Sequence, residues 1–225
     1  MSAPAWDIIA RIETPFAEKF GVPRQSGIAD SPGRIVFEKP FRDVDAVRGL
    51  EGFSHIWLIW QFDRAQRQGW SPTVRPPRLG GNERVGVFAT RSPFRPNGLG
   101  LSAVELERVA LDEPDSPVLY VRGADMVSGT PIFDIKPYLA YTDSHPEASG
   151  SFALAGDAVR VECAEGVLDA LPQEKRETLL RVLAQDPRPG YQHEAGRVYG
   201  FPFGGFEVRF TVADGVLTVL SAEKV

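Results

Sequence analysis

Hydrophobic and polar residues alternate in short runs along much of the chain, and Gly, Pro or Asp separates one run from the next. This pattern is typical of β-strands, because branched and aromatic residues favour an extended backbone. Residues 56–60, Ile-Trp-Leu-Ile-Trp, are apolar without alternation, which predicts a strand buried on both faces in a barrel or sandwich core. Residues 104–111 fit a strand about as well as a helix, and residues 43–50 predict a short helical turn. The predicted strands are residues 6–12, 33–37, 53–62, 85–89 and 118–122.

The pattern changes after a polar segment at residues 143–150. Residues 173–185 carry apolar side chains at helical spacing with charges elsewhere, which predicts an amphipathic helix. Residues 206–212 and 216–222 resemble strands on either side of Asp214-Gly215, a pair typical of hairpin turns. The fold class is therefore expected to be mainly β, with a small α+β domain at the end. The predicted domains are residues 1–145 and residues 150–225.

Composition narrows the class of protein. In 225 residues, 43% hydrophobic and 24% charged, no apolar run approaches the ~18 residues that span a membrane. The first residues lack the basic and apolar regions of a secretory signal, so a cytoplasmic, membrane-free protein is expected. The single cysteine, Cys163, excludes an internal disulfide. Because His55, His145 and His193 lie far apart in the sequence, no metal site is expected.

Charge is distributed unevenly along the chain. The net charge is −5, yet residues 64–104 contain seven arginines against one acid, Glu83. One basic surface on an acidic protein suits contact with phosphates at a defined place without indiscriminate binding to nucleic acid. Residues 64–82 within this stretch form a long loop rich in Arg, Gly and Pro, and such loops are usually functional or mobile. The alternative is a solvated arginine-rich loop with no particular partner.

Residues 85–102 hold the densest pattern in the chain, a short apolar run followed by two arginines, two prolines, an asparagine and two glycines. The prolines restrict the backbone around Arg91 and Arg95, so both guanidinium groups start from a stiff loop. A rigidly held guanidinium suits a planar or anionic ligand, since it donates two parallel hydrogen bonds. The alternative is an ordinary surface turn.

The same stretch contains Gly98-x-Gly100-x-x-Ala103, which matches a dinucleotide-binding fingerprint. That fingerprint requires a strand that runs directly into the first glycine and a helix after the last one. Loop-like residues separate Ala89 from Gly98, so the sequence argues against a Rossmann phosphate site.

Three further segments carry candidate chemistry: residues 20–25, residues 52–57 with His55, and residues 129–138 with Asp134 and Lys136. Taken singly, each also has an ordinary explanation. A histidine at a strand start is usually a core residue with a satisfied hydrogen bond, and the aspartate and lysine suit a cross-strand ion pair.

In this order along the chain, these segments resemble the TrmO family, also called YaeB, which has a TsaA-like N-terminal domain. The C-terminal segments 186–191 and 197–199 are similar to the second domain of that family, so the resemblance covers almost the whole chain. Phe133 departs from the pattern, since a smaller aliphatic residue is expected there. The segments that carry the resemblance are Pro23-Arg24-Gln25, Gly52 to Trp57, Val85 to Asn97 and Asp134 to Tyr138.

The resemblance implies an S-adenosylmethionine-dependent tRNA methyltransferase built on a β-barrel rather than a Rossmann sheet and working as a homodimer. It further implies methylation at N6 of the threonylcarbamoyl-modified adenosine 3′ of the anticodon, so the anticodon loop of tRNA is the expected partner. The cofactor-binding residues that it implies are Pro23, Arg24, Gln25, His55, Ile56, Arg91, Leu101, Asp134, Ile135, Lys136 and Pro137.

Several roles stay open at this point. Arg91 or Arg24 suits the cofactor carboxylate, and Leu101 and Ile56 suit its adenine. The expected substrate-binding residues are Arg95, Asn97, Arg188 and Tyr191, and the candidates for proton transfer are His55, Asp134 and Tyr138.

The alternative functions are a non-catalytic S-adenosylmethionine-binding protein and an RNA-binding protein on the same barrel. The arginine-rich stretch and the additional C-terminal domain favour an RNA substrate over a bare cofactor sensor.

Overall fold

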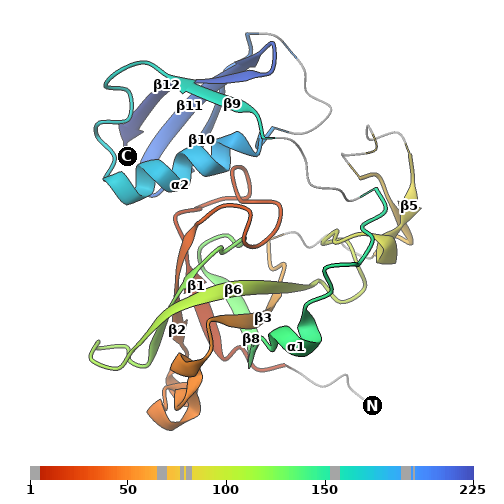
Figure 1. The fold of residues 1–225 in the computed structure, drawn as a ribbon, viewed down its shortest axis with the longest axis vertical. Helices are drawn as coiled ribbons and strands as arrows, with labels where there is room; N and C mark the ends of the chain where they lie inside the picture. Colours follow the sequence, from red (N-terminus) through yellow and green to blue (C-terminus); the bar gives the residue numbers. More distant parts are fainter. Residues whose placement is uncertain are drawn as a thin grey trace.

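Six antiparallel strands form a closed barrel in the order β1-β2-β7-β6-β3-β8 (Figure 1). The computed structural model describes residues 6–64, 70–76, 79, 83–152, 158–188, 194 and 196–225. The pairing of β1 with β8 closes the barrel. This arrangement confirms the mainly β fold. The barrel strands are β1 (Ala10–Glu13), β2 (Pro32–Phe37), β3 (His55–Gln61), β6 (Leu99–Ala110), β7 (Val118–Arg122) and β8 (Thr130–Pro137).

Strand β3 alternates between the barrel interior and the outer surface. Ile56, Leu58 and Trp60 are buried in the barrel core, whereas Trp57 and Ile59 face outward and are half-buried. The prediction that this strand is buried on both faces is therefore wrong. A barrel wall has one packed face, so even an apolar strand presents every second side chain to the outside.

The region before β6 also differs from its prediction. Only Val85–Gly86 form a strand (β5), paired with β4 (Thr73–Val74), and Val87–Ala89 form a 3-10 turn, η5. Residues 104–111, which the pattern left open, lie mostly within β6. No helix follows Gly98 and Gly100, which confirms that they are not a dinucleotide fingerprint.

Short 3-10 turns connect β2 to β3, in the region where one helical turn was expected. Asp43 caps the second of them by accepting a hydrogen bond from the main-chain N–H of Asp45. The three turns are η1 (Lys39–Phe41), η2 (Val44–Val47) and η3 (Leu50–Gly52).

Beyond the short helix α1 (Ala140–Asp143), the described residues of the C-terminal part form a four-stranded sheet and one helix. Helix α2 (Gln173–Ala184) buries Leu179, Val182 and Leu183 in a core shared with the sheet, as its amphipathic pattern predicts. The sheet has the order β10-β11-β12-β9, with β9 parallel to β12. Its strands are β9 (Arg160–Cys163), β10 (Tyr199–Phe203), β11 (Phe206–Ala213) and β12 (Val216–Lys224).

The segment between β1 and β2 reaches from the barrel to the C-terminal sheet (Figure 1, red to orange). Phe16 and Ala29 are buried in the C-terminal core, and Phe16 forms a bridge with Phe203 of β10. Gly21 has a positive φ of 88°, and a Cβ there would lie 2.4 Å from the Phe201 ring. Part of the N-terminal sequence thus completes the C-terminal core.

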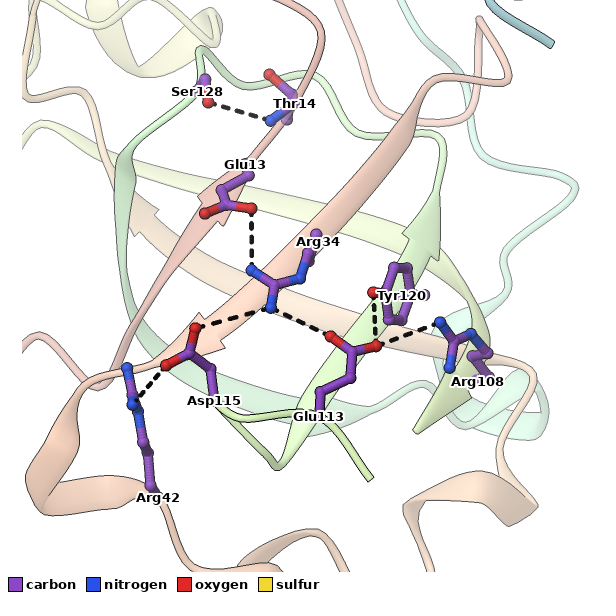
Figure 2. Close-up of polar contacts among 9 residues, drawn as sticks. All are labelled: Glu13, Thr14, Arg34, Arg42, Arg108, Glu113, Asp115, Tyr120 and Ser128. Atoms are coloured by element: carbon purple, nitrogen blue, oxygen red, sulfur yellow. Dashed lines mark hydrogen bonds and ion pairs between the residues drawn. The ribbon is translucent and has the colours of Figure 1, made fainter. Parts of the chain in front are cut away.

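A network of ion pairs braces the barrel on the outside of β1, β2 and β7 (Figure 2). Arg34 pairs with Glu13 at 3.1 Å and with Glu113 at 3.2 Å, and the Tyr120 hydroxyl donates to Glu113 at 2.7 Å. The Tyr120 hydrogen bond is the main reason why the pKa of Glu113 is lowered. Through Glu113 and Asp115, the network joins the β6–β7 turn to Arg34 and Arg42, and it contains none of the predicted site residues.

No helix among the described residues is long and apolar enough to cross a membrane.

Candidate cofactor and substrate site

The residues expected to bind a cofactor fall into two groups. The first group lies on two loops, residues 23–26 and 90–97, that meet beside the start of β6. The second group lies on the outer face of the barrel, along strands β6, β3 and β8. The first group thus comes from loops, and the second comes from strands of the barrel wall.

The first group is joined by Arg91 and Gln25. Arg91 Nη1 donates a hydrogen bond to Gln25 Oε1, although the two residues are 66 positions apart. The loop that carries Arg91 is stabilised locally: the Thr90 hydroxyl donates to Val87 O at 2.8 Å and accepts from Ser92 N at 3.2 Å. The stiff loop predicted from the prolines therefore presents an exposed guanidinium beside an amide.

Arg95 braces this loop from within. Its Nη1 donates to the main-chain oxygen of Thr90 at 2.9 Å and to that of Ser92 at 3.5 Å, and its side chain is half-buried. Asn97 is exposed at the end of the loop. Arg95 keeps donor groups for a ligand, but part of its hydrogen-bonding capacity serves the loop itself.

Arg24 connects the first group to the C-terminal part of the chain. Its Nη2 donates to the main-chain oxygen of Asp186 at 2.9 Å and to that of Arg188 at 3.2 Å. The loop after α2 therefore supports residues 23–26. Of the two candidates for the cofactor carboxylate, Arg91 donates its side-chain hydrogen bond among the described residues to Gln25, within its own group.

Arg188 is engaged by its neighbour Asp186. Nε and Nη2 donate to the two carboxylate oxygens, each at 2.8 Å, and only 11% of the Arg188 side chain is exposed. Burial opposes ionisation of Asp186, but the Arg188 contact outweighs it and lowers the pKa of Asp186. This arrangement favours a structural role for the loop over a grip on phosphate. Tyr191 lies outside the described residues.

The second group begins with a row across three strands. Leu101 on β6 and Asp134 on β8 both pair in register with Ile59 on β3, and Leu101 is 57% exposed. Asp134 Oδ2 lies 3.0 Å from Lys136 Nζ on the same strand. An apolar side chain and an ion pair are thus neighbours on one exposed face.

Two predicted cofactor residues point the other way. Ile56 is fully buried in the barrel core, and Ile135 packs against that core. The Ile56 side chain therefore faces away from the surface that carries Leu101 and Asp134, and the adenine-binding role expected for Ile56 stays a prediction. Among the remaining members, Pro23 is also buried, whereas Pro137 is exposed beside Ile56.

His55 and Tyr138 lie together at the far end of this face. Their rings are 6.1 Å apart, and Tyr138 N donates to His55 O at 3.0 Å. His55 is exposed, with Nδ1 3.0 Å from Ser54 Oγ, so it is not a core histidine. Asp134 pairs with Ile59, which lies four residues beyond His55 on β3. At 3.3 Å per residue, His55 and Ile59 are about 13 Å apart along the strand. The three candidates for proton transfer therefore do not meet at one point within the chain.

Two acidic residues of the site were not singled out from the sequence. Asp143 accepts hydrogen bonds from Leu139 N at 3.0 Å and from Trp57 Nε1 at 2.8 Å, and these bonds lower its pKa. It orients the Trp57 ring beside Tyr138, 5.5 Å away. Asp125, the other residue, accepts a hydrogen bond from the Ser102 hydroxyl at 2.7 Å.

Among the described residues, no cluster of three or more His, Cys, Asp or Glu side chains is placed to hold a metal ion.

Comparison with known proteins covers both parts of the chain. The family described as "tRNA-methyltransferase O N-terminal domain" matches residues 11–144, and "TrmO C-terminal domain" matches residues 157–225. The "tRNA (adenine(37)-N6)-methyltransferase" of Escherichia coli (strain K12) is 45% identical over 99% of each chain. The "Putative S-adenosylmethionine-dependent methyltransferase RcsF" of Pseudomonas aeruginosa is 40% identical over 90% of each.

A solved structure has the same architecture. A crystal structure of TrmO from Pseudomonas aeruginosa superimposes with a TM-score of 0.81 at 31% identity, covering 100% of this chain and 99% of that one.

Proposed function

The chain belongs to the tRNA-methyltransferase O family, and we infer its function from that membership. The chain is an S-adenosylmethionine-dependent tRNA methyltransferase that acts at N6 of adenine 37. The structural observation that supports this most directly is the contact between Arg91 and Gln25, because it assembles two distant segments into one donor group.

The chemistry of the described side chains fits the cofactor. The Arg91 guanidinium suits a carboxylate, and the exposed Leu101 side chain offers an apolar surface for a base. The Asp134 carboxylate suits an ammonium or ribose hydroxyl group. When bound, S-adenosylmethionine supplies a methyl group on a sulfonium that a nitrogen atom can attack.

The acceptor nitrogen needs help from the protein, because a urea-like nitrogen has a delocalised lone pair. His55 is our candidate base, since its Nδ1 faces Ser54 and no hydrogen bond within the described residues engages its Nε2. Lys136 is placed to stabilise a developing negative oxygen. Asp134 remains a second candidate base, and Tyr138 orients the His55 ring.

We propose that the substrate adenosine already carries a threonylcarbamoyl group and lies in the anticodon loop. That group adds a carboxylate, and Arg95 with Asn97 lies on the same loop as Arg91. The basic stretch also includes Arg84, whose Nη1 is held by Thr73 Oγ1 at 2.9 Å. These positive charges suit the phosphates that flank the target base.

We also propose a homodimer in which both groups of site residues serve one cofactor, one group from each subunit. The support is the division of the site residues: Leu101 and Asp134 lie on the outer face of the barrel strands, whereas Arg91 and Gln25 lie on loops. A facing subunit supplies the missing half of the site, and the exposed Leu101 then lies in the interface.

The C-terminal domain is proposed to help hold tRNA through the loop at residues 186–191. Because Arg188 is bound to Asp186, its contribution is to shape the loop, and Tyr191 is the candidate for stacking on an unpaired base. Unchanged methylation by the double variant R188A/Y191A would show that this loop is a structural turn and does not help to hold tRNA.

Three measurements test the proposed function. Calorimetry with S-adenosylmethionine alone detects the cofactor site, and incubation with tRNA and labelled cofactor detects transfer of the methyl group. Nucleoside mass spectrometry of tRNA from a strain that lacks the protein should show loss of the methylated nucleoside. Cofactor binding without transfer would favour a sensor, and tRNA binding without cofactor would favour a plain RNA-binding protein.

A further inference from the structure

A chain of hydrogen bonds joins side chains on β3 and β6 to a carboxylate that follows β7. Trp60 Nε1 donates to Ser102 Oγ at 2.9 Å, and the Ser102 hydroxyl donates to Asp125 Oδ1 at 2.7 Å. Trp60 and Ser102 are buried in the barrel. The indole lies so close to Gly100 that a Cβ there would be 2.2 Å from it. Since the indole N–H occupies the serine oxygen, the serine proton is directed at Asp125.

The Asp125 carboxylate also interacts with both loops of the first group of site residues. Gly27 N donates to Gly123 O at 3.0 Å, two residues before Asp125, and the main-chain N–H of Ser26 and the positive charge of Arg91 both favour the ionised carboxylate. Ser26 follows Gln25, which accepts the hydrogen bond from Arg91. Asp125 therefore lies next to the loop that carries Gln25, and its charge acts on Arg91.

Burial works against the charge at this position. It raises the pKa of Asp125 to about 6, although the bonds from Ser102 and Ser26 and the charge of Arg91 favour ionisation. An asparagine would accept the same hydrogen bonds without this penalty. The interaction that only a carboxylate supplies is attraction for the Arg91 guanidinium.

We propose that Asp125 is a positioning residue for the cofactor site: its half-buried carboxylate fixes loop 23–26 and draws the Arg91 guanidinium toward Gln25. The donor group is then assembled before the cofactor arrives, which removes the need to order a flexible arginine on binding. The proposal rests on the proposed function, because it takes Arg91 and Gln25 as the residues that receive S-adenosylmethionine.

The test is calorimetric titration of the full-length protein with S-adenosylmethionine, without tRNA, between pH 5 and pH 8. Protonation of Asp125 removes the charge, so wild-type affinity should fall as the pH decreases through about 6. We call this fall in affinity at low pH the acid limb. In D125N, affinity at pH 8 should be about tenfold lower, a usual size for coupling between two sites. This acid limb should also disappear, whereas a limb that arises from another group would persist.

Two further variants separate positioning from a general effect on folding. S102A keeps the carboxylate but removes a bond that favours its charge, so the acid limb should move to higher pH. D112N, at an exposed aspartate in the β6–β7 turn, should behave as wild type. Wild-type affinity and an unchanged acid limb in both D125N and S102A would overturn the proposal. Failure of the wild-type protein to bind S-adenosylmethionine would instead contradict the proposed function, and the positioning role with it.

Discussion

Arg24 on the loop between β1 and β2 donates from Nη2 to the main-chain oxygen of Asp186, 162 residues further along the chain, at 2.9 Å. The same nitrogen contacts the main-chain oxygen of Arg188 at 3.2 Å. Because Arg24 adjoins Gln25, the C-terminal domain holds one end of the candidate cofactor site. We therefore propose that this domain supports cofactor binding, in addition to any contact with tRNA.

We predict that D186A lowers the affinity for S-adenosylmethionine, although Asp186 lies outside the proposed cofactor contacts. The substitution removes both bonds to Arg188, and it places alanine at a positive φ of 47°, so the loop loses its shape. Loss of a hydrogen bond to a charged group is worth about 1.5–3 kcal/mol, and we expect an affinity loss of about tenfold as part of this reaches Arg24. Calorimetry at pH 7.5 measures it.

The matched control is R181A. Arg181 also crosses between the two parts of the chain, pairing with Asp30 at 3.1 Å, but it does not contact residues 23–26. We expect R181A to bind the cofactor as wild type does. Equal affinity losses in D186A and R181A would show that domain docking in general, and not support of Arg24, is what matters.

Local pattern predicts the elements whose residues decide their own conformation. The helix at residues 173–185 is found at 173–184, and β7 is found at residues 118–122 as predicted, because apolar spacing is a local property. Residues 85–89 show the limit. Their composition favours a strand throughout, but Val87 N donates to Pro72 O at 2.9 Å and the chain turns there. That partner lies in a loop, which leaves no periodic signal.

The site was predictable to a similar extent. The resemblance brings Arg91 and Gln25 to one site, and their contact agrees with it. The acceptors of Arg24 are main-chain oxygens, which any residue type supplies, so the sequence carries no sign of them. Asp125 stands in an ordinary Gly-Ala-Asp segment, and only burial next to Ser102 marks it out.

We predict that R91A loses most of its affinity for S-adenosylmethionine. Truncating one partner of a desolvated charge pair typically costs about 2–5 kcal/mol, which is at least about thirtyfold in affinity. R84A is the matched control, since Arg84 belongs to the same basic stretch but bonds to Thr73 on the β4–β5 hairpin. It should retain cofactor affinity and bind tRNA less tightly. Calorimetry and a filter-binding assay measure the two quantities, and unchanged cofactor affinity in R91A would remove this loop from the cofactor site.

We predict that methylation depends on prior threonylcarbamoylation of adenosine 37. The modification supplies a carboxylate, and the half-buried Arg95 keeps donor groups for it on the same loop as Arg91. Initial rates should be compared on tRNA purified from strains with and without the modifying activity. Similar rates on both tRNAs would contradict the prediction.

We predict that D125N is more stable than wild type at pH 8 but not at pH 4. The pKa of Asp125 rises from 3.8 to about 6 on folding, so the folded state binds more protons between these values and wild-type stability falls as the pH increases through them. The full difference above pH 7 is about 3 kcal/mol, at about 1.4 kcal/mol per pKa unit. Urea unfolding at several pH values measures it. A D125N protein that is less stable than wild type at pH 8 but not at pH 4 would mean that the charge supports the fold itself.

Finally, we predict that L101E prevents dimer formation and cofactor binding together. Leu101 is 57% exposed on the outer face of the barrel, in register with Ile59 beside Asp134, and a buried unpaired charge there opposes a subunit interface. L111E is the matched control, because Leu111 is 56% exposed just after β6 but lies away from this face. Light scattering should find L111E at twice the monomer mass of 24.7 kDa and L101E at that mass. A monomeric L101E protein that still binds S-adenosylmethionine and methylates tRNA would show that each subunit carries a complete site.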